Sequence, residues 1–472
     1  MDFETVIGLE VHTELATDHK IFCGCSTKFG GEPNTHVCEI CSGMPGTLPV
    51  LNKQVVEFAM RAGLATNCTI TRYNKFDRKN YFYPDLPKAY QISQLYLPIC
   101  QNGYIELDSG KKIRIKEIHM EEDAGKLIHD EWEGCTLVDY NRCGVPLLEI
   151  VSEPDLSSAA EVQEYLEKLR AILQYTKVSD CKMQEGSLRA DVNLSVRERG
   201  AKEYGVRTEM KNLNSFKAIT RAIESERERQ IDAIESGEKI VQETRRWDDS
   251  KGISYAMRSK EDAQDYKYFP EPDIPPIEIS DEWLSSIEET MPELPDAKKA
   301  RYINELGLPE YDTGIITGSI YLVDLFEETA EVCGSPTEAA KWIMGDLMKL
   351  LNESGTLPED MKVSGNALGT IIKMLAEQKI SRATARKVFE KVFTDNVDPE
   401  SYVKENNLGV MTDTGAIRSV IEKVISENTK SVEEYKSGKE KAIQYLIGQS
   451  MRALRGQAPA AEVTKILHEI LD

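Results

Sequence analysis

The sequence lacks long hydrophobic runs and has little positive charge. No apolar stretch approaches the roughly 20 residues that a membrane-spanning helix needs, so we expect no membrane contact. A strand pattern begins almost at the first residue and leaves no room for a signal or transit peptide, so we expect a cytoplasmic protein. The net charge of −22 argues against a general nucleic-acid coat protein, because phosphate binding needs Lys and Arg, but it leaves room for a local basic patch.

Several motifs of nucleotide-binding and hydrolytic enzymes are also missing. The sequence has neither a G-x-x-x-x-G-K-[ST] phosphate loop nor a dinucleotide glycine fingerprint. It has no G-x-S-x-G elbow, and its 6 histidines form no strong Cys–His pairing, so a hydrolase with a nucleophile has little support. With 472 residues, 40% of them hydrophobic and 29% charged, the chain has an ordinary composition and room for about three domains.

The first predicted strand, residues 6–15, carries potential metal ligands on one face. Side chains alternate between the two faces of a strand, so the apolar residues belong to the core while Glu10, His12 and Glu14 share the other face. Carboxylates and imidazole bind divalent cations. The alternative is an ordinary polar outer face with a chance histidine.

Three later segments also combine acids with bases. They are 119–126 with Glu121, Glu122 and Asp123, 188–196 with Arg189 and Asp191, and 206–211 with Arg207, Glu209 and Lys211. An acidic turn in water is the alternative for the first of them. Together the four segments predict a polar sheet face that holds a nucleotide and its metal. Carboxylates and a metal with nearby cations suit phosphoryl transfer, in which the protein mostly positions phosphates and neutralises charge.

Four cysteines predict a structural metal site. Their C-x-C…C-x-x-C spacing can close around one tetrahedral Zn²⁺ in a zinc knuckle over residues 23–41, with Cys23, Cys25, Cys38 and Cys41 as ligands. The alternative is four reduced, unligated thiols. Catalysis at this ion is not expected, because four thiolates leave no open position.

Two further stretches are candidates for binding nucleic acid or nucleotide. Residues 75–88 are dense in cations and aromatics, which hold phosphates and stack bases, although a packed irregular segment gives the same pattern. From Lys430 to Asp472 there are seven Lys or Arg and six Asp or Glu, so the formal net charge of this part is +1. Within it, residues 449–457 are a candidate RNA-facing stretch, with a solvated helix face as the alternative.

The order of patterns indicates three regions. Strand and helix patterns alternate up to a Pro-rich boundary at 291–295, helical periodicity follows, and the composition changes again near 407–409. We therefore predict an α+β chain with domains at 1–292, 293–407 and 408–472.

Several long motifs resemble the B-subunit family of aspartyl/glutamyl-tRNA amidotransferases. The matching stretches are 6–15, 76–93 (FDRKNYFYPDLPKAYQIS), 119–126 (HMEEDAGK), 138–156 (VDYNRCGVPLLEIVSEPDL), 186–196, 211–216, 268–273 and 448–457. The resemblance covers the whole chain. It implies a cradle of antiparallel sheet with flanking helices, then a helical domain and a small helical tail that binds tRNA.

The resemblance also implies a reaction. ATP with Mg²⁺ would phosphorylate the side-chain carboxylate of Glu-tRNA(Gln) or Asp-tRNA(Asn), and ammonia would then displace the phosphate to form the amide. The ammonia would come from a separate amidase (A) subunit, and a small C subunit would hold the two large subunits together. The missing hydrolase nucleophile fits this division of labour.

Residue roles follow from the polar face and the resemblance together. We expect Glu10, His12 and Glu122 as first-choice Mg²⁺ ligands and Glu121 and Asp191 as second choices. Lys79, Arg189 and Lys211 are expected to contact ATP phosphates or the charge that develops in transfer. The catalytic set is therefore Glu10, His12, Glu122 and Lys79, the nucleotide-binding set is Lys79, Arg189, Asp191 and Lys211, and the four cysteines match the family's zinc knuckle.

Two other functions remain as alternatives. One is a zinc-stabilised, tRNA-binding scaffold without catalysis, which has no use for a convergence of Glu10, His12 and Glu122. The other is a free-standing ATP-dependent ligase for small amino acids, which the tail disfavours because such an enzyme would not need it.

Overall fold

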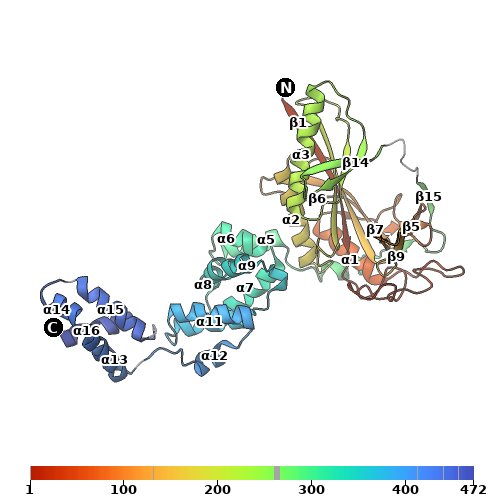
Figure 1. Ribbon diagram of the computed structural model, residues 1–472. Coiled ribbons are helices and arrows are strands. Elements are labelled where there is room, and N and C mark those ends of the chain that lie inside the picture. Colours follow the sequence, from red (N-terminus) through yellow and green to blue (C-terminus); the bar gives the residue numbers. More distant parts are fainter. Residues whose placement is uncertain are drawn as a thin grey trace. The chain divides into compact units, whose positions relative to one another are not determined.

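The computed structural model describes residues 2–130, 132–259, 266–411, 413–439, 441–454 and 457–471. The chain divides into two compact units, Met1–Pro295 and Asp296–Asp472. The first is built around sheets and the second is helical, which confirms the predicted α+β class (Figure 1). The unit boundary lies close to the predicted boundary at 292. The predicted boundary at 407 falls within the second unit and stays a prediction.

A nine-stranded sheet forms the frame of the first unit. Its order is β14-β13-β12-β11-β1-β10-β7-β6-β2. The strands are β1 (Phe3–Glu14), β2 (Thr69–Ile70), β6 (Cys100–Glu106), β7 (Lys112–Glu122), β10 (Pro146–Ser152), β11 (Leu188–Glu198), β12 (Thr208–Lys211), β13 (Glu243–Asp248) and β14 (Ile253–Ser259). Its neighbouring strands are antiparallel except for β12 and β13, which run parallel because the helix α3 (Phe216–Glu235) connects them as a crossover. The resemblance implied an antiparallel sheet, and this one parallel pair departs from it.

Three smaller sheets complete the strand content of the described first unit. One has the order β15-β4-β5, formed by β15 (Lys267–Pro270), β4 (Asp77–Asn80) and β5 (Tyr90–Ser93). The second pairs β3 (Tyr73–Asn74) with β16 (Ile277–Glu278), and the third is a hairpin of β8 (Lys126–Asp130) and β9 (Cys135–Asp139). Lys79 lies on β4, in the same unit as the polar sheet face.

Alternation along β1 separates the core from the polar face. Every second residue is buried, and Ile7, Leu9 and Val11 are at most 1% exposed. The helices α1 (Lys53–Ala65), α2 (Ala159–Tyr175), α3 and α4 (Asp281–Glu288) complete the unit, and α2 and α3 pack against each other. Burial of the apolar side of the sheet leaves Glu10 and His12 half-buried on its other side.

The second unit consists of short helices. They are α5 (Pro295–Asn304), α6 (Glu310–Thr317), α7 (Ile320–Cys333), α8 (Pro336–Trp342), a π-helical turn (Ile343–Leu347), α9 (Met348–Ser354), a 3₁₀ turn (Pro358–Asp360), α10 (Gly365–Ala376), α11 (Arg382–Asp395), α12 (Pro399–Glu405), α13 (Thr414–Glu427), α14 (Thr429–Lys436), α15 (Lys441–Ala453) and α16 (Ala460–Leu471). Residues from Ile417 to Leu471 share a hydrophobic cluster of their own. The candidate RNA-facing stretch 449–457 includes residues 455 and 456, which lie outside the described residues.

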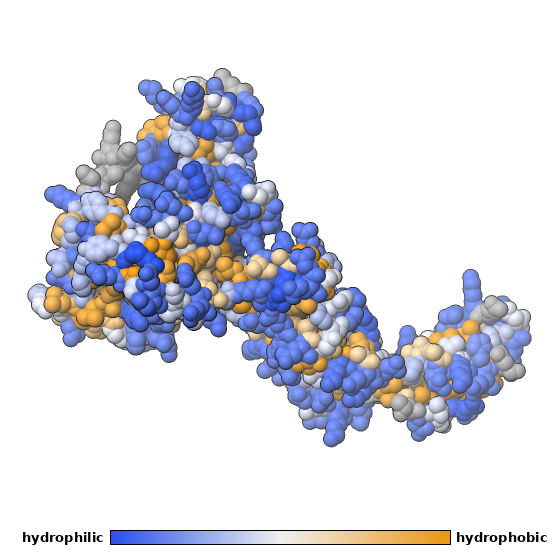
Figure 2. All heavy atoms as spheres, turned by 180° about the vertical axis from the view of Figure 1, so that it is seen from behind, coloured by the Kyte–Doolittle hydropathy of each residue, from blue (hydrophilic) through white to orange (hydrophobic). Residues whose placement is uncertain are grey.

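The surface is mainly polar. Figure 2 shows hydrophilic side chains over most of one face of both units, with smaller hydrophobic areas between them. Among the described residues, no helix is both long enough and apolar enough to span a bilayer.

Candidate active site

Strand register builds the polar face of the large sheet. Beside β1, the strand β11 places Asp191 opposite Glu10 and Arg189 opposite His12. On the other side of β1, the strand β10 places Glu149 opposite His12. Residues directly opposite each other in neighbouring strands project to the same face, so these charged side chains converge in space.

One acidic group consists of His12, Glu121 and Glu149, whose ligand atoms lie within 4.8 Å of one another. The His12 Nε2 atom is 3.6 Å from Glu121 Oε1 and 4.0 Å from Glu149 Oε1. Burial and the Glu149 charge raise the pKa of Glu121. Burial also opposes ionisation of Glu149, but His119, whose Nδ1 lies 3.6 Å from Glu149 Oε2, together with the charges of His12 and Lys79 outweighs it and lowers the Glu149 pKa to about 2. One imidazole and two carboxylates that converge in this way are a donor set that suits a divalent cation.

A second acidic group lies beside it and consists of Glu10, Asp191 and Glu209, again with ligand atoms within 4.8 Å. Lys211 donates to Asp191 Oδ2 at 2.7 Å, and its Nζ lies 2.9 Å from Glu209 Oε1. Asn193 donates to Glu10 Oε1 at 2.9 Å. Burial, with the charges of Glu149 and Glu209, still raises the pKa of Glu10. One lysine thus leaves three carboxylates incompletely neutralised, which fits a second cation position.

Lys79 faces the first acidic group from β4. Burial disfavours its charged form, but the charges of Glu121 and Glu149 together with neighbouring tyrosines outweigh this effect, so the Lys79 pKa is raised. Its Nζ also lies 4.8 Å from the centre of the Tyr266 ring and 5.8 Å from that of Tyr81, within cation–π range. A fixed ammonium beside a carboxylate group can neutralise a transferring phosphoryl group.

Arg189 is engaged with carboxylates in the structure. It donates to Asp123 Oδ2 at 2.8 Å, and Arg142 Nε lies 3.4 Å from the same oxygen. Burial and the Asp123 charge raise the pKa of neighbouring Glu14 to about 7. The phosphate contact that we predict for Arg189 would compete with this network, and that role stays a prediction.

Glu122 does not join Glu10 and His12, so the first-choice ligand set does not assemble. Its carboxylate receives Lys88 Nζ at 2.5 and 2.6 Å and the backbone N–H of Ile92 at 3.0 Å. Consecutive strand residues point to opposite faces. On β7, Glu121 projects to the face that carries His12, so Glu122 projects away from it. The second-choice residues Glu121 and Asp191 do meet His12 and Glu10, respectively.

The sequence pattern does not identify two residues of these groups as ligands. Glu149 lies among apolar residues in a predicted strand, and Glu209 lies on the predicted polar face without a ligand role. A lone acid within an otherwise apolar strand is the available signal for Glu149, since such a side chain rarely sits at a core position without a partner.

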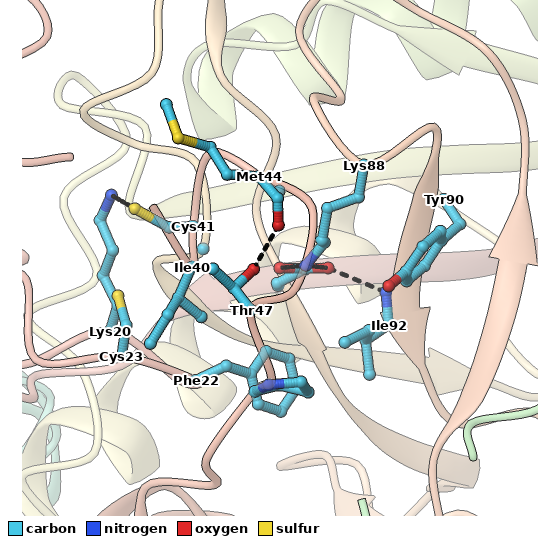
Figure 3. A pocket seen from close by; sticks show the side chains of 14 residues that line it. Lys20, Phe22, Cys23, Ile40, Cys41, Met44, Thr47, Lys88, Tyr90 and Ile92 are labelled. Carbon is cyan, nitrogen blue, oxygen red and sulfur yellow. Dashed lines mark hydrogen bonds and ion pairs between the residues drawn. The ribbon is translucent and has the colours of Figure 1, made fainter. Parts of the chain in front are cut away.

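The Lys88–Glu122 ion pair lies in a separate pocket of about 120 Å³. Figure 3 shows Lys88, Tyr90 and Ile92 on one side of this pocket and Lys20, Cys23 and Cys41 on the other. Lys20 is fully buried and donates to the carbonyl oxygen of His36 at 2.7 Å. The pocket thus lies between the predicted zinc knuckle and Glu122 at the C-terminal end of β7.

The four knuckle cysteines converge as their spacing predicts. The sulfur atoms of Cys23, Cys25, Cys38 and Cys41 lie within 4.8 Å of one another. A hydrogen bond with Cys23 stabilises the Cys41 thiolate against the effect of burial and lowers the Cys41 pKa to about 4. Four thiols at one point, one of them readily ionised, are a donor set that fits a structural Zn²⁺.

The chain matches two family models and is similar to several known proteins. Residues 5–285 match the family model of the GatB/GatE catalytic domain, and residues 324–471 match that of the GatB domain. Proteins similar over their full length include the aspartyl/glutamyl-tRNA(Asn/Gln) amidotransferase B subunit of Lachnoclostridium phytofermentans, 63% identical with 99% of each chain covered. The corresponding B subunit of Caldicellulosiruptor bescii is 58% identical with 100% of each chain covered. The chain belongs to the family of aspartyl/glutamyl-tRNA(Asn/Gln) amidotransferase B subunits.

Proposed function

We propose that this chain carries the ATP-dependent chemistry of a glutamine-hydrolysing tRNA amidotransferase in the cytoplasm. It phosphorylates the side-chain carboxylate of Glu-tRNA(Gln) or Asp-tRNA(Asn) with ATP and then converts it to the amide. The observation that carries this proposal is the pair of adjacent acidic groups on one sheet face, His12/Glu121/Glu149 and Glu10/Asp191/Glu209, with Lys79 and Lys211 beside them.

The reaction has two steps. A carboxylate oxygen of the esterified amino acid attacks the terminal phosphorus of ATP, and ADP leaves. Ammonia then attacks the acyl carbon, the phosphate leaves with the former carboxylate oxygen, and a proton is lost from nitrogen. The first step needs no general base because the carboxylate is already ionised, so electrostatic positioning is the main requirement.

The chain's own residues meet this requirement. The two acidic groups would hold Mg²⁺, which when bound supplies positive charge between the attacking carboxylate and the triphosphate. Lys79 and Lys211 place ammonium groups at the same face. The Cys23/Cys25/Cys38/Cys41 group would hold Zn²⁺ in a structural role.

The partners follow from the same chemistry. The ammonia would come from an amidase (A) subunit, and a small C subunit would complete the three-subunit complex. The helical tail would grip the body of the tRNA while the sheet unit receives its acceptor end. Because tRNA binding would depend on contacts between local basic residues and phosphates, it should weaken steeply with salt, although the whole chain has a net charge of −22.

Phosphate release from ATP tests this proposal. The chain is assembled with its amidase and small partner subunits and given Glu-tRNA(Gln), or in parallel Asp-tRNA(Asn), without an amide donor. Release should depend on the misacylated tRNA and fall to background in Glu149→Gln and Glu209→Gln. The matched control is Glu106→Gln, an exposed glutamate of β6 outside both acidic groups.

Two outcomes would contradict the proposal in different ways. Release that survives in both variants would move the chemistry to another site. Absence of tRNA-dependent release from the wild-type complex, with tRNA still bound, would favour the non-catalytic scaffold.

A further inference from the structure

Lys20 lies inside the first unit, next to the four-cysteine group. It is 0% exposed, which makes it the least exposed lysine or arginine among the residues that the structure describes. The roles proposed above assign the four cysteines to the metal and leave Lys20 without a use. A buried ammonium is unfavourable unless an anion and hydrogen-bond acceptors compensate for its lost hydration, so its partners are informative.

Three neighbours account for the three N–H groups of the Lys20 ammonium. It donates to the carbonyl oxygen of His36 at 2.7 Å, to that of Tyr140 at 3.4 Å and to Cys41 Sγ at 3.6 Å. Figure 3 shows the Lys20 ammonium beside the Cys41 sulfur. Within the described part of the chain, no carboxylate forms an ion pair with Lys20. Of the three neighbours, only the Cys41 thiol can supply a negative charge.

Metal binding explains why a cation is needed at this point. The sulfur atoms of the four cysteines lie within 4.8 Å of one another, and cysteine binds metals as the thiolate. Four thiolates exceed the charge of a divalent ion by two negative charges. Lys20 offsets one of these two charges in a buried environment, where an uncompensated charge is unfavourable.

Lys20 also connects the four-cysteine group to the segment that precedes β10. In addition to the contact with the Tyr140 carbonyl, the N–H of neighbouring Ile21 donates to the carbonyl oxygen of Gly144 at 3.0 Å. A Cβ atom at Gly144 would lie 3.5 Å from both Lys20 Cδ and Cys41 Cβ, so this segment packs directly on the pair. The Lys20–Cys41 pair therefore lies where the knuckle and this segment meet.

We propose that Lys20 is the counter-ion of the metal–thiolate complex and holds it in its four-thiolate form. Its N–H contact stabilises negative charge on the Cys41 sulfur, as outer partners of metal ligands do. Lys20 is a positioning residue that acts through Cys41 and is not itself a metal ligand. This inference rests on the metal role proposed for the four cysteines. The alternative is a tether that only joins two backbone carbonyls, and the charge of the side chain distinguishes the two.

Cobalt substitution tests the charge of Lys20. The full-length chain is loaded with Co²⁺ in place of Zn²⁺, and the sulfur-to-cobalt charge-transfer absorption is compared for the wild type, Lys20→Met and Lys20→Gln. Both substitutions remove the charge, while glutamine keeps N–H donors for a carbonyl oxygen. Without the ammonium, the sulfur electrons are held less tightly, so the absorption should shift to longer wavelength in both variants. The Zn²⁺ affinity of the cysteines, measured by chelator competition, should fall about 10–100-fold.

Two control variants accompany this comparison. Lys20→Arg keeps the charge and should stay close to the wild type, so arginine against glutamine still decides the question if Lys20→Met does not fold. Lys28→Met removes an exposed cation of the same knuckle and should leave both the absorption and the Zn²⁺ affinity unchanged.

A double-mutant cycle separates charge compensation from tethering. Cys41→His replaces a thiolate by a neutral imidazole, another common Zn²⁺ ligand, and so removes one negative charge from the complex. In this background, Lys20→Met should reduce Zn²⁺ affinity much less than in the wild type, because fewer negative charges need compensation.

Three results would overturn the inference. Unchanged absorption and Zn²⁺ affinity in Lys20→Met and Lys20→Gln would show that the ammonium does not compensate the complex. An equal loss of affinity from Lys20→Met with and without Cys41→His would assign Lys20 to tethering alone. Failure of the proposed metal role appears differently, as a wild-type chain that binds neither Zn²⁺ nor Co²⁺ at its cysteines, and it would overturn both.

Discussion

Glu121 and Glu122 are consecutive residues of β7, yet their carboxylates point to opposite faces of the strand. Glu121 meets His12 on the polar face, with 3.6 Å between Oε1 and Nε2, whereas Glu122 forms a buried ion pair with Lys88. The period of two along a strand requires this separation. Substitutions at the two positions should therefore have different consequences.

Glu122→Ala should destabilise the protein by about 3–5 kcal/mol, because it leaves the buried Lys88 ammonium without a partner. Replacement of both residues, Lys88→Met with Glu122→Met, should recover much of this loss, since an apolar pair needs no desolvation of charge. Urea unfolding of both variants and the wild type measures this. Equal destabilisation by the single and double changes would contradict a structural ion pair.

Glu121→Gln should act on metal binding instead. Removing a carboxylate from the first acidic group should lower Mn²⁺ affinity at least tenfold, since changes to outer partners of metal ligands alone cost about 10–100-fold. Mn²⁺ titration followed by electron paramagnetic resonance measures the affinity. The exposed Glu106→Gln serves as the control, and unchanged Mn²⁺ binding in Glu121→Gln would remove this residue from the ligand set.

Zinc content tests the knuckle. The purified chain should contain one Zn²⁺, and Cys25→Ser should lose it together with several degrees of thermal stability, because metal binding contributes to folding. The matched control is Cys333→Ser, which lies in the second unit and outside the four-cysteine group. Elemental analysis and calorimetry give both readouts, and full zinc occupancy in Cys25→Ser would refute the ligand assignment.

His119 should make stability depend on pH. Burial opposes its charge, but the carboxylates of Glu117 and Glu149, which lie 3.4 and 3.6 Å from its ring nitrogens, raise its pKa from 6.5 to about 9. A raised pKa in the folded state adds stability that is complete below pH 6.5 and disappears as the pH rises through about 9. Between these values, the free energy of unfolding of the metal-free wild type should fall relative to that of His119→Gln, by at most about 1.4 kcal/mol per pH unit. If the free energies of unfolding of the wild type and His119→Gln differ by the same amount from pH 6 to pH 9, folding does not change the proton binding of His119.

The helical tail should contribute to tRNA use rather than to the chemistry. Residues from Ile417 to Leu471 form their own hydrophobic cluster, so deletion of 408–472 removes a self-contained core. KM for misacylated tRNA should rise sharply while ATP affinity stays close to that of the wild type. Steady-state kinetics at two salt concentrations measure both, and an unchanged KM for tRNA would show that the tail does not contribute to tRNA binding.

Local patterns determined much of this protein in advance. Alternation along β1 separates Ile7 and Val11 from Glu10 and His12, and the C-x-C…C-x-x-C spacing brings four thiols together. Both outcomes depend on nearby residues of the chain, because strand periodicity and short loops act over a few positions. The α+β class and the change to helices near residue 295 follow from the same kind of pattern.

Tertiary structure alone decided which polar residues meet. Strand order and register place Glu149 of β10 opposite His12 of β1, and they keep Glu122 away from both Glu10 and His12. Register depends on pairing between strands more than a hundred residues apart, and a shift of one residue would turn every side chain to the other face.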